Sequence, residues 1–186
     1  MNERLTAASG AVLFLLLAAE GVTILFIRPL LSTHVFIGML LIPPVALKLA
    51  STGWRMLRYY LGAGEYVRRG PPHPFLRMVV APVAVVSTIV LFATGVGLVV
   101  LDRTSGIVVG LHTAGFVVWF GAVGVHVLVR IVRLPDALRL SRPGVAVRVG
   151  LAAATVAAGV AVATLSLPAA DHLQDRVSAQ VGFDGG

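Results

Sequence analysis

The sequence contains no cysteine, a single lysine and few charged residues of any kind. The absence of cysteine excludes disulfide bonds, iron–sulfur ligation and thiolate zinc sites, and leaves the five histidines as candidate metal ligands. Charged residues make up 12% of the chain, whereas a soluble domain of this length carries roughly a quarter. Because 58% of the residues are hydrophobic, lipid rather than charge must cover the surface. The sequence therefore predicts an integral membrane protein.

Five apolar stretches are long enough to cross a bilayer, which takes about 20 residues of α-helix. The predicted spans cover about residues 5–27, 29–54, 78–101, 104–129 and 149–170. Pro29 suits the first turn of the second helix, where its missing N–H leaves no bond unmade. The segment from Tyr59 to Arg77 is basic and rich in glycine and proline, which predicts an irregular connection. The predicted fold is all-α, a single membrane domain of five helices followed by a short tail at residues 171–186.

The arginines are distributed unequally between the two ends of these helices. With five spans, eleven arginines fall on the side of the N-terminus and three fall on the other side: Arg28, Arg103 and Arg176. Because positively charged residues are retained in the cytoplasm, a multi-pass protein of the cell membrane is predicted, with its N-terminus inside and its tail outside. Topology and contact with anionic lipid thus explain the net charge of +7, and nucleic acid is not expected as a partner.

Three histidines lie within the predicted spans. His112 and His126 are 14 residues apart, which places both on one face of the fourth helix, about 21 Å apart along its axis. The second and fourth helices run in the same direction, and His34 and His112 both lie about 8–10 Å below the outer surface. An iron ion between them could take one imidazole from each, as in a haem with two histidine ligands. Gly38 and Gly115, about one turn further on, would let a porphyrin face approach the backbone.

Other residues bear on the number and anchoring of haems. Arg28 and Arg103 lie near the outer surface and are suited to pair with haem propionates. Lys48 lies at the depth of His126 on the second helix, and the first helix offers no ligand at that depth. Lys48 would ligate iron as a neutral amine or, alternatively, extend to the headgroup region. The residues therefore leave open whether one haem or two are bound.

With these residues placed, the chain resembles the membrane cytochrome b subunits of bacterial formate dehydrogenases and nickel–iron hydrogenases, over roughly residues 5–133. The resemblance rests on His112 and His126, with thirteen residues between them, and on His34 in the second helix. It implies a four-helix transmembrane bundle with two b-type haems, to which this chain adds a fifth helix. The histidine that the family has in its first helix is missing. Such subunits pass electrons between the quinone pool and an extracytoplasmic redox enzyme, often a molybdenum oxidoreductase.

The sequence thus predicts a haem b electron-transfer subunit rather than a stand-alone catalyst, with His34 and His112 as iron ligands and His126 as a further candidate. Two other hypotheses are kept. A haem-free membrane anchor or assembly subunit would use its histidines only to bond helices together. An ion or proton carrier would use Glu20 and Lys48, although these two residues lie at different depths. His73 and His172 are expected to be solvated, and colour separates the hypotheses because only the cytochrome is red.

Overall fold

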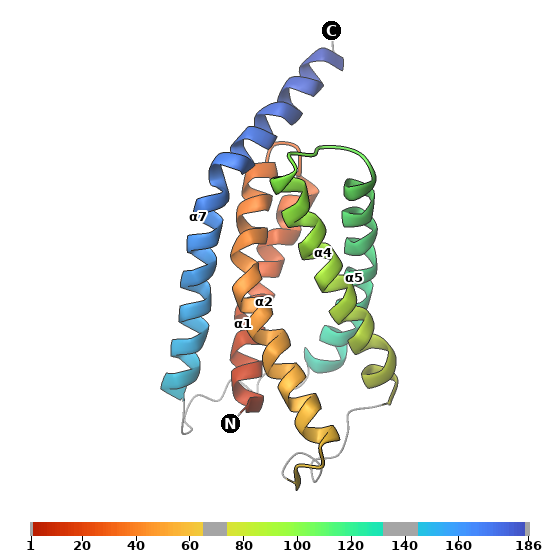
Figure 1. The fold of residues 1–186 in the computed structure, drawn as a ribbon, viewed down its shortest axis with the longest axis vertical. Helices are drawn as coiled ribbons and strands as arrows, with labels where there is room; N and C mark the ends of the chain where they lie inside the picture. Colours follow the sequence, from red (N-terminus) through yellow and green to blue (C-terminus); the bar gives the residue numbers. More distant parts are fainter. Residues whose placement is uncertain (1, 65–73, 132–144, 185–186) are drawn as a thin grey trace.

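The computed structural model describes residues 2–64, 74–131 and 145–184, and these ranges are helical without any strand (Figure 1). The all-α fold predicted from the sequence is confirmed for them. A π-helical turn, η1, continues directly into the α-helix that follows it. The elements in chain order are α1 (Asn2–Leu25), α2 (Leu31–Tyr60), η1 (Leu76–Val80), α4 (Ala81–Val100), α5 (Ile107–Ile131) and α7 (Val145–Asp184).

Four helical segments of the described chain are long and apolar enough to cross a membrane: Leu31–Tyr60, Leu76–Val100, Ile107–Leu128 and Val149–Gln180. A shorter apolar helix, Leu13–Leu25, belongs to α1. Large apolar side chains point outward from the bundle, such as Phe120 with 64% and Leu165 with 83% of their surface exposed. Such a surface is stable against lipid acyl chains but not against water. The length and composition of these helices are those of a multi-pass membrane protein.

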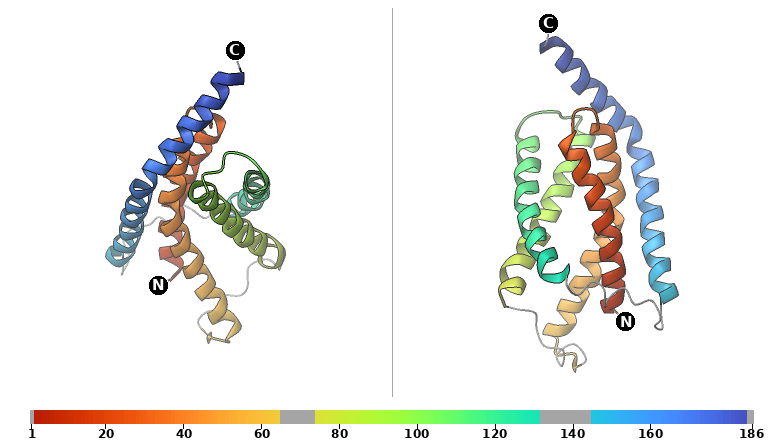
Figure 2. Two further views of the ribbon diagram at one scale, coloured as in Figure 1. Left: turned by 45° about the horizontal axis from the view of Figure 1, so that its top comes forward. Right: turned by 180° about the vertical axis from the view of Figure 1, so that it is seen from behind.

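Successive helices alternate in direction, so that α1, α4 and α7 run one way and α2 and α5 run the other (Figures 1 and 2). The connections at residues 26–30 and 101–106 lie at one end, which we call the upper end. α2 packs against α1 and α7, whereas α5 packs mainly against α4. Trp119 of α5 donates a hydrogen bond from Nε1 to Oγ1 of Thr88 on α4 at 3.0 Å, which joins these two helices. The two groups of helices meet mainly through α2 and α4.

The most extensive helix–helix contact joins α2 and α7. Gly159 of α7 lies so close to α2 that a Cβ atom added there would collide with the carbonyl oxygen of Leu40. Ala163, one turn further along α7, has no exposed surface and packs with Met39 and Leu40. Small residues at this spacing let two helix backbones approach closely, which is how helices associate in lipid.

Two predicted boundaries around α2 are wrong. Pro29 lies in the turn at residues 26–30 rather than in the first turn of a helix, because α2 begins at Leu31. At its other end α2 continues to Tyr60, and Arg77 belongs to η1. The predicted irregular segment between Tyr59 and Arg77 is therefore helical at both ends. The guanidinium carbon of Arg77 lies 5.9 Å from each ring centroid of Tyr59 and Tyr60, and this contact joins the end of α2 to η1.

α7 extends well beyond its apolar segment. The tail predicted from residue 171 onward is helical as far as Asp184, with Pro168 inside the helix. This part of α7 leans across the upper end of the bundle (Figure 2). Nε2 of Gln174 donates a hydrogen bond to the carbonyl oxygen of Arg28 at 2.6 Å, and Arg176 forms an ion pair with Asp102. The last turns of α7 therefore tie the connections 26–30 and 101–106 together.

Candidate functional site

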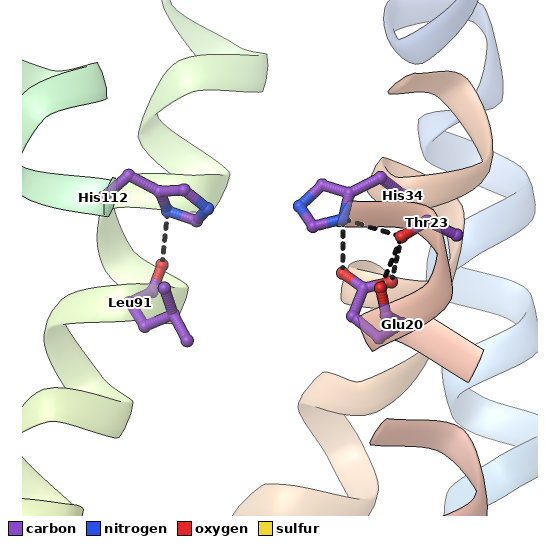
Figure 3. Close-up of polar contacts among 5 residues, drawn as sticks. All are labelled: Glu20, Thr23, His34, Leu91 and His112. Atoms are coloured by element: carbon purple, nitrogen blue, oxygen red, sulfur yellow. Dashed lines mark hydrogen bonds and ion pairs between the residues drawn. The ribbon is translucent and has the colours of Figure 1, made fainter. Parts of the chain in front are cut away.

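Two histidine rings face one another between the two groups of helices, near the upper end. His34 belongs to α2 and His112 to α5, and their ring centroids lie 6.4 Å apart with the ring planes at 89°. Figure 3 shows the two rings pointing toward each other from opposite sides. Residue counting placed both histidines at one depth, and the structure brings their side chains together.

The His112 ring is held by α4. Its Nδ1 lies 3.2 Å from the carbonyl oxygen of Leu91 and 3.1 Å from Oγ1 of Thr94. A carbonyl oxygen can only accept, so Nδ1 carries the ring proton and Nε2 keeps its lone pair. The Thr94 hydroxyl donates its own proton to the carbonyl oxygen of Val90 at 2.7 Å and can therefore accept from Nδ1. In Figure 3 the nitrogen that is not bonded to Leu91 lies on the side of His34.

The His34 ring is held by α1. Its Nδ1 lies 3.0 Å from Oε1 of Glu20 and 3.0 Å from Oγ1 of Thr23. The Thr23 hydroxyl donates to the backbone carbonyl of Glu20 at 2.6 Å, which leaves its lone pairs free to accept. A proton on Nδ1 satisfies these contacts and leaves the Nε2 lone pair of His34 directed at His112 (Figure 3). Both rings then have the same tautomer.

Gly95 of α4 provides the space that the His112 ring occupies. A Cβ atom at Gly95 would lie 3.1 Å from Cε1 of His112, closer than ordinary van der Waals contact. Gly38 and Gly115, which were predicted to let a porphyrin approach the backbone, each have protein atoms nearby. A Cβ at Gly38 would lie 3.5 Å from Oε1 of Glu20, and one at Gly115 would lie 3.4 Å from a side chain of α4. Both glycines thus lie at contacts between helices.

The other residues predicted to hold a cofactor lie apart from the facing rings. Arg28 and Arg103 are exposed in the two connections of the upper end, the end nearest the histidine pair. His126 and Lys48 lie 14 residues further along α5 and α2, and both are half-buried. The structure thus brings two histidine rings together near the upper end, and it places His126 and Lys48 on separate helices at the lower level.

The two remaining histidines were predicted to be solvated. His73 lies outside the described residues. His172 is exposed, as expected, but it belongs to α7 and its Nδ1 lies 3.4 Å from Oδ1 of Asp102. Asp102 also pairs with Arg176, so His172 is part of the contact between α7 and the connection 101–106.

The donor set at the facing rings restricts what they could bind. Within the described ranges, no group of three or more histidine, aspartate or glutamate side chains is close enough to hold a metal ion. A bare zinc ion takes about four ligands, more than this pair supplies. Two imidazoles on opposite sides suit a metal whose other ligands come from a planar macrocycle. With metal–nitrogen bonds of about 2.0 Å, two such imidazoles have ring centroids about 6 Å apart, and the observed separation is 6.4 Å.

The sequence did not identify the groups that orient the two rings. Counting residues along the helices gives Glu20 the same depth as the histidine pair, but it does not give the rotation of α1 that turns Glu20 toward α2. Leu91 contributes only a backbone oxygen, which no side-chain pattern reveals. Thr94 was weakly indicated by the sequence, because a hydroxyl group in a largely apolar helix often forms a hydrogen bond to a neighbouring helix.

Comparison of the chain with protein-family models, with curated proteins and with solved structures finds no match.

Proposed function

We propose that this protein is a membrane b-type cytochrome subunit that binds haem between His34 and His112. The supporting observation is the pair of rings that face each other at 6.4 Å, each fixed through Nδ1 and each with an Nε2 lone pair directed at the other. Two lone pairs directed at one point repel unless an electron-pair acceptor lies between them. Haem iron is such an acceptor and, when bound, supplies one-electron exchange between its ferric and ferrous forms.

The chain's own residues would hold and shield that group. The Nδ1 contacts fix both the tautomer and the tilt of each ligand, the outer-shell arrangement usual for metal-binding histidines. The His34 side chain is only 19% exposed, so the immediate surroundings of the ligand are largely dry. Arg28 and Arg103 are exposed at the same end and would pair with the propionates.

The wider role follows from the family resemblance. The subunit would transfer electrons between the quinone pool and an extracytoplasmic redox enzyme, for which a molybdenum oxidoreductase is the candidate. The arginine distribution supports a cytoplasmic N-terminus and an external C-terminus. The upper end, with the histidine pair and the end of α7, would then face the extracytoplasmic partner.

The test is spectroscopic. The full chain, purified from haem-replete cells, should give a reduced-minus-oxidised spectrum of a b-type haem. The pyridine haemochrome method should find one haem per chain. His34→Ala and His112→Ala should each abolish it, because each removes one of the two histidines that would hold the haem, whereas His172→Ala should retain it as the matched control. A colourless wild-type protein would refute the proposal.

The same measurement decides about a second haem. His126 would need another ligand at its level, and Lys48 would have to lose a proton from an amine whose ordinary pKa is about 10.4. We therefore expect His126→Ala to retain most of the haem. Two haems in the wild type, with one lost in His126→Ala, would establish a second site at that level.

The haem-free anchor is the second candidate, because one observation favours it as well. Through Nδ1, His34 bonds α1 to α2, and His112 bonds α4 to α5. Such bonds stabilise helix pairs without a cofactor. A folded, colourless protein that loses thermal stability in His34→Ala and His112→Ala would support the anchor.

A further inference from the structure

We propose that Glu20 is a positioning residue that acts on the haem iron through His34. Glu20 would strengthen the bond between His34 and the iron and would lower the reduction potential of the site. The inference rests on the proposed haem function. Its basis is a difference between the two rings. Among the described residues, the acceptors at Nδ1 of His112 are groups that do not ionise, the Leu91 carbonyl and the Thr94 hydroxyl, whereas Nδ1 of His34 lies 3.0 Å from an oxygen of an ionisable carboxyl group.

A carboxylate that accepts from Nδ1–H increases the electron density of the imidazole. A more basic imidazole is a stronger ligand, and it stabilises ferric iron more than ferrous iron. For a metal to bind at Nε2, the ring proton must be on Nδ1, and the Glu20 oxygen is then its acceptor. Glu20 therefore acts on the iron through His34 and not by contact.

The placement of Glu20 supports a specific use of this carboxyl group. It lies on a membrane helix with only 13% of its side chain exposed, where a carboxyl group is costly and usually functional. Its oxygens are in contact with Nδ1 of His34 on α2 and with the hydroxyl of Thr23 on its own helix. Gly38 of α2 leaves room beside Oε1, because a Cβ there would lie 3.5 Å away. The carboxyl group is thus directed at the histidine.

The first test separates the charge from the hydrogen bond. Glu20→Gln keeps an acceptor oxygen but cannot carry a negative charge, so the purified holoprotein should retain haem and show a higher midpoint potential in a redox titration. Asp175→Asn is the matched control, since it removes an exposed carboxylate on α7, and its midpoint potential should equal that of the wild type. Glu20→Leu removes the acceptor as well and should weaken haem binding by about 10–100-fold.

The second test isolates the Nδ1 contact. In His34→Gly, added imidazole can replace the lost side chain, and its N–H can donate to Glu20. 1-Methylimidazole binds iron equally through its other nitrogen but has no N–H. Imidazole should therefore restore the b-type spectrum at a several-fold lower concentration than 1-methylimidazole. This preference should disappear in the double variant His34→Gly with Glu20→Leu.

The outcomes are distinguishable. A wild-type protein without haem refutes the proposed function, and with it this inference. A wild-type protein with haem whose midpoint potential is unchanged in Glu20→Gln, and which shows equal rescue by the two imidazoles, overturns the role of Glu20 alone. A raised potential together with the imidazole preference supports it.

Discussion

The rings of His34 and His112 are each oriented by a residue of another helix, α1 in one case and α4 in the other. Such contacts fix the direction of an imidazole lone pair within narrow limits. A substitution beside a ring can therefore alter the orientation of a proposed iron ligand without replacing that ligand. Gly95 is the clearest such position, because its missing Cβ leaves space for the His112 ring.

We predict that Gly95→Ala lowers the haem content of the purified protein several-fold. The added Cβ would lie 3.1 Å from Cε1 of His112, so the ring must shift and its lone pair turn away. Gly97→Ala is the matched control, because Gly97 lies on the same helix and a Cβ added there would have nothing within 4 Å. Both changes raise helix propensity similarly, so equal pyridine haemochrome values would contradict the role of Gly95.

A second prediction at this scale concerns the angle between the rings. The planes of the two rings stand at 89°. If haem is bound, the two imidazoles would therefore donate π density to different d orbitals of the iron and would leave these orbitals nearly equal in energy. We expect the oxidised protein to give a low-spin EPR signal with one unusually large g value. The ordinary rhombic signal of parallel ligand planes would show that at least one ring turns when haem binds.

At the scale of the helices, the close contact between α2 and α7 requires that residue 159 has no side chain. Gly159→Ala should destabilise the protein by about 1–3 kcal/mol, the usual cost of overpacking, because its Cβ would collide with the Leu40 carbonyl. Thermal unfolding in detergent measures this. Gly150→Ala, also on α7 and with nothing within 4 Å of its Cβ, should leave stability equal or slightly higher. Equal midpoints for the two variants would contradict the close packing.

The helices were predictable from the sequence to different degrees. Hydropathy located the apolar segments because the bilayer thickness sets a minimum length. Hydropathy did not predict the end of α7, because it marks only where contact with lipid stops. The mostly polar segment Asp171–Gln180 continues the helix, since it includes good helix formers such as Leu173, Gln174 and Arg176. The depth of His34 and His112 followed from counting residues. The rotation of α1 that turns Glu20 toward His34 could not be predicted, because α1 is apolar on all sides around Glu20.

At the scale of the whole molecule, the arginine distribution predicts which end faces the cytoplasm. The native chain has no cysteine, so single cysteines report sidedness without background. On intact cells, a membrane-impermeant maleimide should label Ser105→Cys at the exposed upper end. Leu61→Cys, exposed at the other end, should be labelled only after permeabilisation. The reverse pattern would place the N-terminus outside.

The partnership of α2 with α7 has a consequence for the order of events during synthesis. α2 is complete at Tyr60, but the helix that covers it ends at Asp184. At 5–20 residues per second, ribosomes need about 6–25 s to make the intervening chain. Until Gly159 has been made, the face of α2 around Leu40 cannot pack against α7. His34 and His112 are both made before α7, so a chain released early would carry both histidines on an unfinished bundle, with that face of α2 accessible to quality-control proteases.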